Sequence, residues 1–76
     1  MNNQRRKKLE ELWDKADELR SLLESLRDEE QEYIDNMPEN LQASERYERA
    51  EDAVDSMDYA LDNLSDAMEN LEDAIG

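Results

Sequence analysis

The sequence predicts an all-α fold: an antiparallel two-helix hairpin, coiled-coil-like, built from the whole chain. Two apolar stripes, one in each half of the chain, repeat with a spacing that alternates between three and four residues. The chain has one Gly and one Pro, so little interrupts long helices, and the Pro falls between the two stripes. A chain of 76 residues makes one domain at most. We therefore expect a single helical hairpin over residues 1–76.

The first helix is predicted over residues 4–36. Eight of the nine stripe positions are apolar or aromatic, and Trp13, Leu22 and Ile34 widen the stripe, which suits a bundle better than a bare two-stranded coil. Glu30 is the one charge in the stripe, and we expect it to set the register or to pair with an arginine, the candidates being Arg27, Arg46 and Arg49. The stripe consists of Leu9, Leu12, Ala16, Leu19, Leu23, Leu26, Glu30, Tyr33 and Met37.

A turn is predicted over residues 37–44. Pro38 cannot continue a helix and disfavours helical geometry at the residue before it, so Asn36 is expected to end the first helix or to cap a short turn opened by Pro38. Ser44 is a suitable N-cap for the next helix, which starts with acidic residues where the helix dipole favours them. Leu41 is expected to pack into the end of the bundle. A connection this short makes the two helices antiparallel neighbours.

The second helix is predicted over residues 45–75, where every stripe position is apolar or aromatic. An alanine also recurs every seven residues beside the stripe, at Ala53, Ala60, Ala67 and Ala74. This row reflects either helix propensity alone or the close approach of another helix, and its unbroken run beside the stripe favours close approach. The stripe consists of Tyr47, Ala50, Val54, Met57, Leu61, Leu64, Met68, Leu71 and Ile75.

Two helices of about 45 Å form a thin object that leaves part of both stripes wet. Pairing two hairpins into a four-helix bundle would cover them, so we expect a homodimer, the alternatives being a lone hairpin or a complex with a different protein. Trp13, Tyr33 and Tyr47 are expected to be core or dimer aromatics. The predicted core and dimer seam consists of Leu12, Trp13, Leu19, Leu23, Leu26, Val54, Met57, Leu61, Leu64, Met68 and Leu71.

The composition argues against an enzyme and against cofactors. There is no Cys and no His, which removes disulfides, thiolate and imidazole metal sites, thiol nucleophiles and histidine bases. The only glycine is Gly76, so neither a phosphate-binding loop nor a calcium loop can be built. Paired carboxylates on two exposed helices lack a pocket that would separate their pKa values for acid–base catalysis. No membrane span or signal peptide is visible, and we expect a cytoplasmic protein.

Charge is the dominant feature of the composition, with 23 acids against 9 bases and a net charge of −14. Residues 50–76 hold nine acids and no base, or about one charge per 4.5 Å of helix, against about one per 3.4 Å for a DNA strand. These acids either keep the protein soluble and pair with the basic residues 5–8, or imitate nucleic acid toward a basic protein. Tyr59 stands among them, as a contact anchor or as an isolated exposed tyrosine. The candidate partner-binding residues are Glu51, Asp52, Asp55, Asp58, Tyr59, Asp62, Asp66, Glu69 and Asp73.

The basic cluster of Arg5, Arg6, Lys7 and Lys8 would in principle suit nucleic acid or a membrane. On a chain with this net charge, pairing within the protein is the better interpretation. We therefore expect no direct contact with nucleic acid and none with a membrane.

The segment Asp28–Arg46, DEEQEYIDNMPENLQASER, followed by the acidic alanine repeat, resembles a group of small acidic helical proteins of Gram-positive, gut-type bacteria and their phages and mobile elements. The resemblance covers most of the chain, and its specific part is the turn segment 36–46. It supplies no activity and no site residue. It implies a phage or mobile-element setting, in which small acidic proteins often block host defence proteins such as CRISPR effectors and restriction enzymes.

The expected function is therefore a non-enzymatic, protein-binding one. Its most concrete form is an inhibitor that occupies the nucleic-acid-binding groove of a basic protein through the acidic residues 51–73. The alternative is a structural or assembly module that binds a partner through its apolar seam, with the acids serving solubility only.

Overall fold

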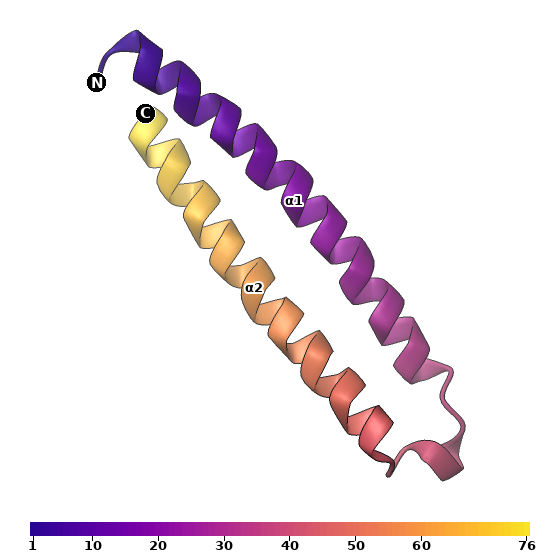
Figure 1. Cartoon of the computed structure of the whole chain (residues 1–76). Helices are drawn as coiled ribbons and strands as arrows, with labels where there is room; N and C mark the ends of the chain where they lie inside the picture. Colours follow the sequence, from indigo (N-terminus) through magenta and orange to yellow (C-terminus); the bar gives the residue numbers. More distant parts are fainter.

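The computed structural model describes residues 1–76 and is a rod of two long helices side by side (Figure 1). Helix α1 spans Asn3–Asp35, a short 3-10 helix η1 spans Glu39–Leu41, and helix α2 spans Glu45–Ile75. The rod measures 59 × 15 × 13 Å, and both chain termini lie at one end. The predicted all-α hairpin is confirmed, with α1 displaced by one residue and α2 as expected. Neither helix contains an apolar stretch that could cross a bilayer.

Side-chain caps begin both helices. The Asn2 side chain accepts a hydrogen bond of 2.8 Å from the Arg5 backbone N–H, a cap that the sequence analysis did not identify. Ser44 was expected to cap the second helix, and its Oγ accepts from the Tyr47 backbone N–H at 3.3 Å. Each cap satisfies a backbone donor that the first turn leaves without an intrahelical partner.

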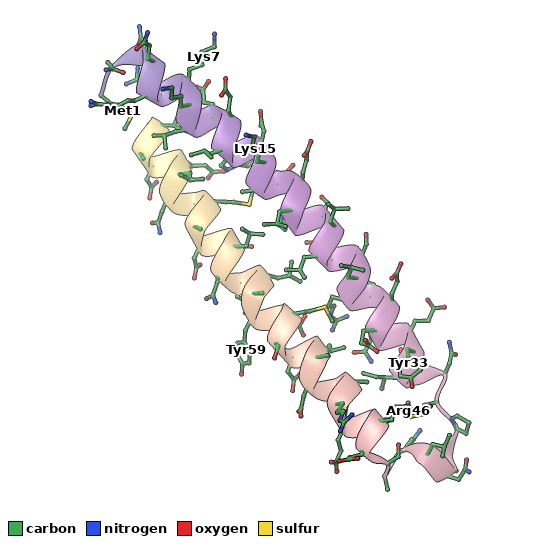
Figure 2. All side chains as sticks on the ribbon, viewed as in Figure 1. Met1, Lys7, Lys15, Tyr33, Arg46 and Tyr59 are labelled. Atoms are coloured by element: carbon green, nitrogen blue, oxygen red, sulfur yellow. The ribbon has the colours of Figure 1, made fainter.

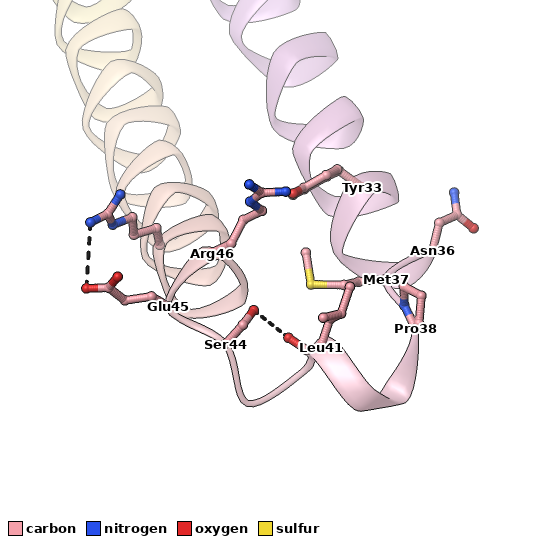
Figure 3. A pocket seen from close by; sticks show the side chains of 9 residues that line it. Tyr33, Asn36, Met37, Pro38, Leu41, Ser44, Glu45 and Arg46 are labelled. Atoms are coloured by element: carbon pink, nitrogen blue, oxygen red, sulfur yellow. Dashed lines mark hydrogen bonds and ion pairs between the residues drawn. The ribbon is translucent and has the colours of Figure 1, made fainter.

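The turn follows the expected chemistry at Asn36 and Pro38 but not at Leu41. Asn36 is the C-cap of α1, and Pro38 directly precedes η1. Leu41 remains 46% exposed and does not pack into the bundle end. The reason is that η1 is an additional turn between the two helices, and Leu41 is its last residue. The Leu41 carbonyl accepts a hydrogen bond from the Ser44 hydroxyl and so joins η1 to α2 (Figure 3).

The hydrophobic core is small and lies mainly near the turn. Ile34 of α1 packs with Ala50 and Val54 of α2, and Tyr47 and Met57 cover this cluster. Only five residues of the chain are buried, and no side chain is completely enclosed. A 76-residue chain that buries so little has a marginal core by itself.

Helix α1 is rotated about its axis relative to the expected stripe. Trp13 and Ile34 turn toward α2, whereas Leu12, Leu19 and Leu26 are more than half exposed. Arg20 and Arg27 occupy the two heptad positions between Trp13 and Ile34. Arg27 forms an ion pair with Asp58 of α2. The rotation therefore replaces one heptad row at the contact with the next: Trp13, Arg20, Arg27 and Ile34 stand where Leu12, Leu19, Leu26 and Tyr33 were expected.

Candidate partner-binding surface

The acids of α2 all lie on one side of the helix. In heptad terms the seam positions are a and d, at Val54 and Met57 and their repeats, and positions e and g border the seam on opposite sides. Every acid from residue 50 onward falls at e, b or f, which together form one continuous half of the helix surface. We call this half, with Tyr59, the acidic flank. It consists of Glu51, Asp52, Asp55, Asp58, Tyr59, Asp62, Asp66, Glu69, Glu72 and Asp73.

Only one acid of the flank has an ion-pair partner. Arg27 of α1 donates from Nε to Asp58 Oδ1 at 2.9 Å and also contacts Asp28 at 3.4 Å. No other acid between residues 50 and 76 lies within ion-pairing distance of a base. Glu30, which was expected to set the register or to pair with an arginine, is half-buried and forms no ion pair. The remaining acids of the flank are therefore free to meet cations from outside.

The Asp58 contact also acts on Arg27 itself. The hydrogen bond from Asp58 raises the pKa of Arg27 above its ordinary value, while partial desolvation opposes this effect. Within the acidic flank, Arg27 therefore balances the charge of Asp58 alone.

One interpretation of the sequence expected the basic residues 5–8 to pair with the acids opposite them on α2. They form no such ion pair. Arg6 instead donates from Nε to the Ile75 backbone carbonyl oxygen at 3.0 Å. This carbonyl is in the last turn of α2, where backbone acceptors lack intrahelical partners and a positive charge suits the helix dipole. Arg6 of the basic cluster therefore caps the C-terminal end of α2. Asp66 and Asp73 remain without an ion-pair partner.

Tyr59 stands in the middle of the acidic flank, as predicted. It is 71% exposed, and its ring points outward from α2 on the side away from α1 (Figure 2). A largely exposed ring surrounded by carboxylates contributes little to the hairpin but can add contact area to a partner.

A small polar hollow lies where α1 borders the acidic flank. It has a volume of about 200 Å³, and it is lined by Trp13 and Arg20 of α1 and by Ser65, Met68, Glu69 and Glu72 of α2. Trp13 Nε1 and Arg20 Nε are buried without a hydrogen-bond partner. Glu69 and Glu72 therefore line the same hollow as two buried donors that lack a hydrogen-bond partner. Trp13 was predicted to lie in the seam, but no pattern in the sequence indicates this polar environment.

A second hollow, of about 860 Å³, lies at the turn and was also not predicted (Figure 3). Its walls combine the apolar Met37 and Leu41 with Tyr33, Arg46 and Arg49. Arg49 Nη2 pairs with Glu45 at 3.7 Å, an exposed contact of small energetic value. The turn end is therefore the one part of α2 that presents cationic side chains.

The predicted seam residues divide into two groups. Those that contact the opposite helix are buried or half-buried: Trp13, Leu23, Val54, Met57, Leu61, Leu64, Met68 and Leu71. The others remain exposed in the hairpin: Leu12, Leu19 and Leu26. Tyr33, expected to be a core or dimer aromatic, is also exposed.

No cluster of acidic residues is arranged to hold a metal ion. No family model, curated protein or solved structure matches the chain. The surface is therefore interpreted from its own geometry and charge.

Proposed function

We propose that this protein is a non-enzymatic binding module whose acidic flank occupies the nucleic-acid-binding groove of a basic protein. The observation that carries the proposal is the one-sided, almost unpaired array of acids in the acidic flank of α2, in which only Asp58 has a basic partner. Acids that only keep a protein soluble need not gather on one half of one helix.

The spacing of these charges supports a nucleic-acid mimic. Along α2 the mean spacing is about 4.5 Å per charge, close enough to the phosphate spacing of one DNA strand for a groove lined by Lys and Arg to engage several acids together. Neighbouring charges lie well within the Debye length of roughly 8 Å at physiological salt, so they act as one field. Such a field speeds association with a basic surface and makes binding sensitive to salt.

The setting belongs to the same proposal. The resemblance of the segment 28–46 to small acidic proteins of phages and mobile elements favours an intracellular anti-defence role, in the cytoplasm. The targets of this class are basic proteins that hold nucleic acid, such as CRISPR effectors and restriction enzymes. Blocking such a groove needs no catalysis and no cofactor.

Affinity capture from a host lysate tests the proposal. The purified protein should retain basic nucleic-acid-binding proteins at low salt, release them at high salt and lose them to added DNA or RNA. A variant with Asp55, Asp62 and Asp66 changed to Lys should retain none of them. The matched control changes three exposed acids of α1, Glu11, Asp14 and Glu18, to Lys, which makes the same change in net charge.

Two outcomes would contradict the proposal. One is equal loss of binding in the α1 control, which would indicate a dependence on net charge alone. The other is capture of a protein that resists high salt and lacks a basic groove. That result would favour the alternative, a structural module that binds through its apolar residues.

We also propose that the working unit is a homodimer in which two hairpins form a four-helix bundle. The support is the exposure of large apolar side chains along α1, which a lone hairpin leaves in water.

A further inference from the structure

The side of the hairpin that borders position g of α2 carries an apolar groove. Its volume is about 640 Å³, and seven of its eight lining residues are apolar. Leucines of α1 form one wall, and small residues of α2 form the other together with Leu64. The lining residues are Leu19, Leu22, Leu23, Leu26, Ala60, Asn63, Leu64 and Ala67.

The α1 wall continues beyond the groove as a ridge along the rod. We call the exposed residues Leu12, Leu19, Leu22, Leu26 and Tyr33 the apolar ridge; each is between 44% and 65% exposed. Members seven residues apart recur about every 10.5 Å along the helix. The ridge therefore follows most of the length of α1 as a continuous apolar strip.

The α2 wall continues as a strip of small uncharged residues. Positions g and c of α2 from residue 53 onward contain no charge at all, whereas the acids all lie at e, b and f. We call this strip the neutral stripe. It consists of Ala53, Ser56, Ala60, Asn63, Ala67, Asn70 and Ala74.

From this arrangement we infer that a second copy of the chain docks on the groove, with the apolar ridge of each copy lying on the neutral stripe of the other. The inference specifies the interface of the proposed homodimer. Large side chains beside a strip of small ones make the face complementary to itself, which is what a twofold interface requires. The small residues of the stripe allow the partner helix to approach closely.

Charge and area both agree with a second copy as the occupant. The acidic flank lies on the opposite side of the α2 seam, so two chains of net charge −14 can meet without bringing their acidic flanks together. The rod presents a face 59 Å long and 15 Å wide, comparable with the roughly 800 Å² per partner that stable specific interfaces bury. The dimer then displays two acidic flanks on its outside.

The contact of ridge with stripe also determines the topology of the bundle. It places α1 of one copy over α2 of the other, which requires a twofold axis parallel to the helices. Every neighbouring pair of helices is then antiparallel, and both turns lie at the same end. The other face-to-face arrangement, with the axis across the rod, would place ridge on ridge and the turns at opposite ends.

Sedimentation equilibrium of the purified protein, without any partner, tests the dimer. The expected mass is twice the chain mass of 9.0 kDa. Changing Ala60 and Ala67 to Gln should weaken the dimer by about a hundredfold or more, because bulky polar side chains would block the stripe. Gln has nearly the helix propensity of Ala and both sites are exposed in the hairpin, so a lone hairpin would tolerate the change. Changing Asp62 and Asp66 to Gln is the matched control and should leave the dimer intact.

A wild-type protein that stays monomeric, or a Gln variant that dimerises as well as the control, would overturn the inference. Lysate capture by a monomer would still support the acidic-flank proposal, so the two can fail separately. Spin labels on Gln42→Cys, at the exposed turn, test the topology. Labels much closer together than the 59 Å rod length support it, and a separation near that length contradicts it.

Discussion

Arg27 of α1 and Asp58 of α2 form the single ion pair between the two helices, with 2.9 Å between Nε and Oδ1. Arg27→Gln should lower the melting temperature only slightly, because the pair is partly exposed and water competes for both groups. The same holds for Asp58→Asn, and the double variant should be no less stable than either single one. A double-mutant cycle followed by circular dichroism measures this coupling. Complete unfolding of Arg27→Gln would show that the pair contributes far more than its exposure suggests.

The buried cluster near the turn should contribute more than the ion pair. Val54 is 5% exposed and packs with Ile34 and Ala50, so Val54→Ala should cost about 1–3 kcal/mol of unfolding free energy. Urea unfolding at fixed protein concentration measures this loss. Tyr59→Ala, at an exposed site of the same helix, is the control and should change stability by no more than about 0.5 kcal/mol. Equal losses in both variants would contradict the location of the core.

The N-cap of α2 gives a third expectation. Ser44→Ala should cost about 1 kcal/mol, because the Tyr47 backbone N–H loses its side-chain acceptor. For a domain of this size that corresponds to a fall of roughly 4–8 °C in melting temperature. Ser44→Gly should cost only a few tenths of that energy, since water can then reach the freed backbone groups. Identical melting temperatures for the wild type and Ser44→Ala would contradict this account.

Salt should stabilise the protein. Like charges four residues apart, as in Asp58, Asp62 and Asp66, repel along α2, and added salt screens that repulsion. The melting temperature should therefore rise with sodium chloride concentration. Changing Asp62 and Asp66 to Asn should raise the low-salt melting temperature and flatten the dependence. A melting temperature that falls with salt would indicate that attractive pairs dominate instead.

Substitutions of the exposed Tyr59 can distinguish an effect on partner binding from an effect on folding stability. If the acidic flank is the contact surface, Tyr59→Ala should weaken the captured complex by about tenfold or more while leaving the melting temperature unchanged. The proposed anchor acts through its ring, so Tyr59→Phe should retain most of the affinity. Binding unaffected by Tyr59→Ala would make this residue an isolated exposed tyrosine, as the alternative interpretation of the sequence holds.

Local sequence signals were sufficient to predict where the two helices and the turn lie. Pro38 and Ser44 act through the backbone within a few residues, so the helix boundaries could be predicted to within one residue. The acidic side of α2 could be recognised as well, because all its members lie on one helix and their mutual positions follow from helical geometry.

The rotation of α1 could not be predicted in the same way. Apolar periodicity favoured Leu19 and Leu26 at the contact, but the helix presents Arg20 and Arg27 to α2 instead. In this orientation Arg27 meets Asp58, 31 residues further along the chain, and no local pattern encodes such a contact. The hollow around Trp13 and the helix cap provided by Arg6 depend on contacts between distant residues in the same way.

The hairpin places both chain termini at one end of the rod (Figure 1), where Arg6 donates a hydrogen bond to the Ile75 carbonyl oxygen. A force applied to the two termini would therefore pull across the rod and not along it. The contacts between α1 and α2 would break one after another from the termini toward the turn. At each step, only the contacts nearest the separated ends would oppose the force. The protein should thus be mechanically weak when stretched by its ends, with the buried cluster of Ile34, Ala50 and Val54 among the last contacts to part.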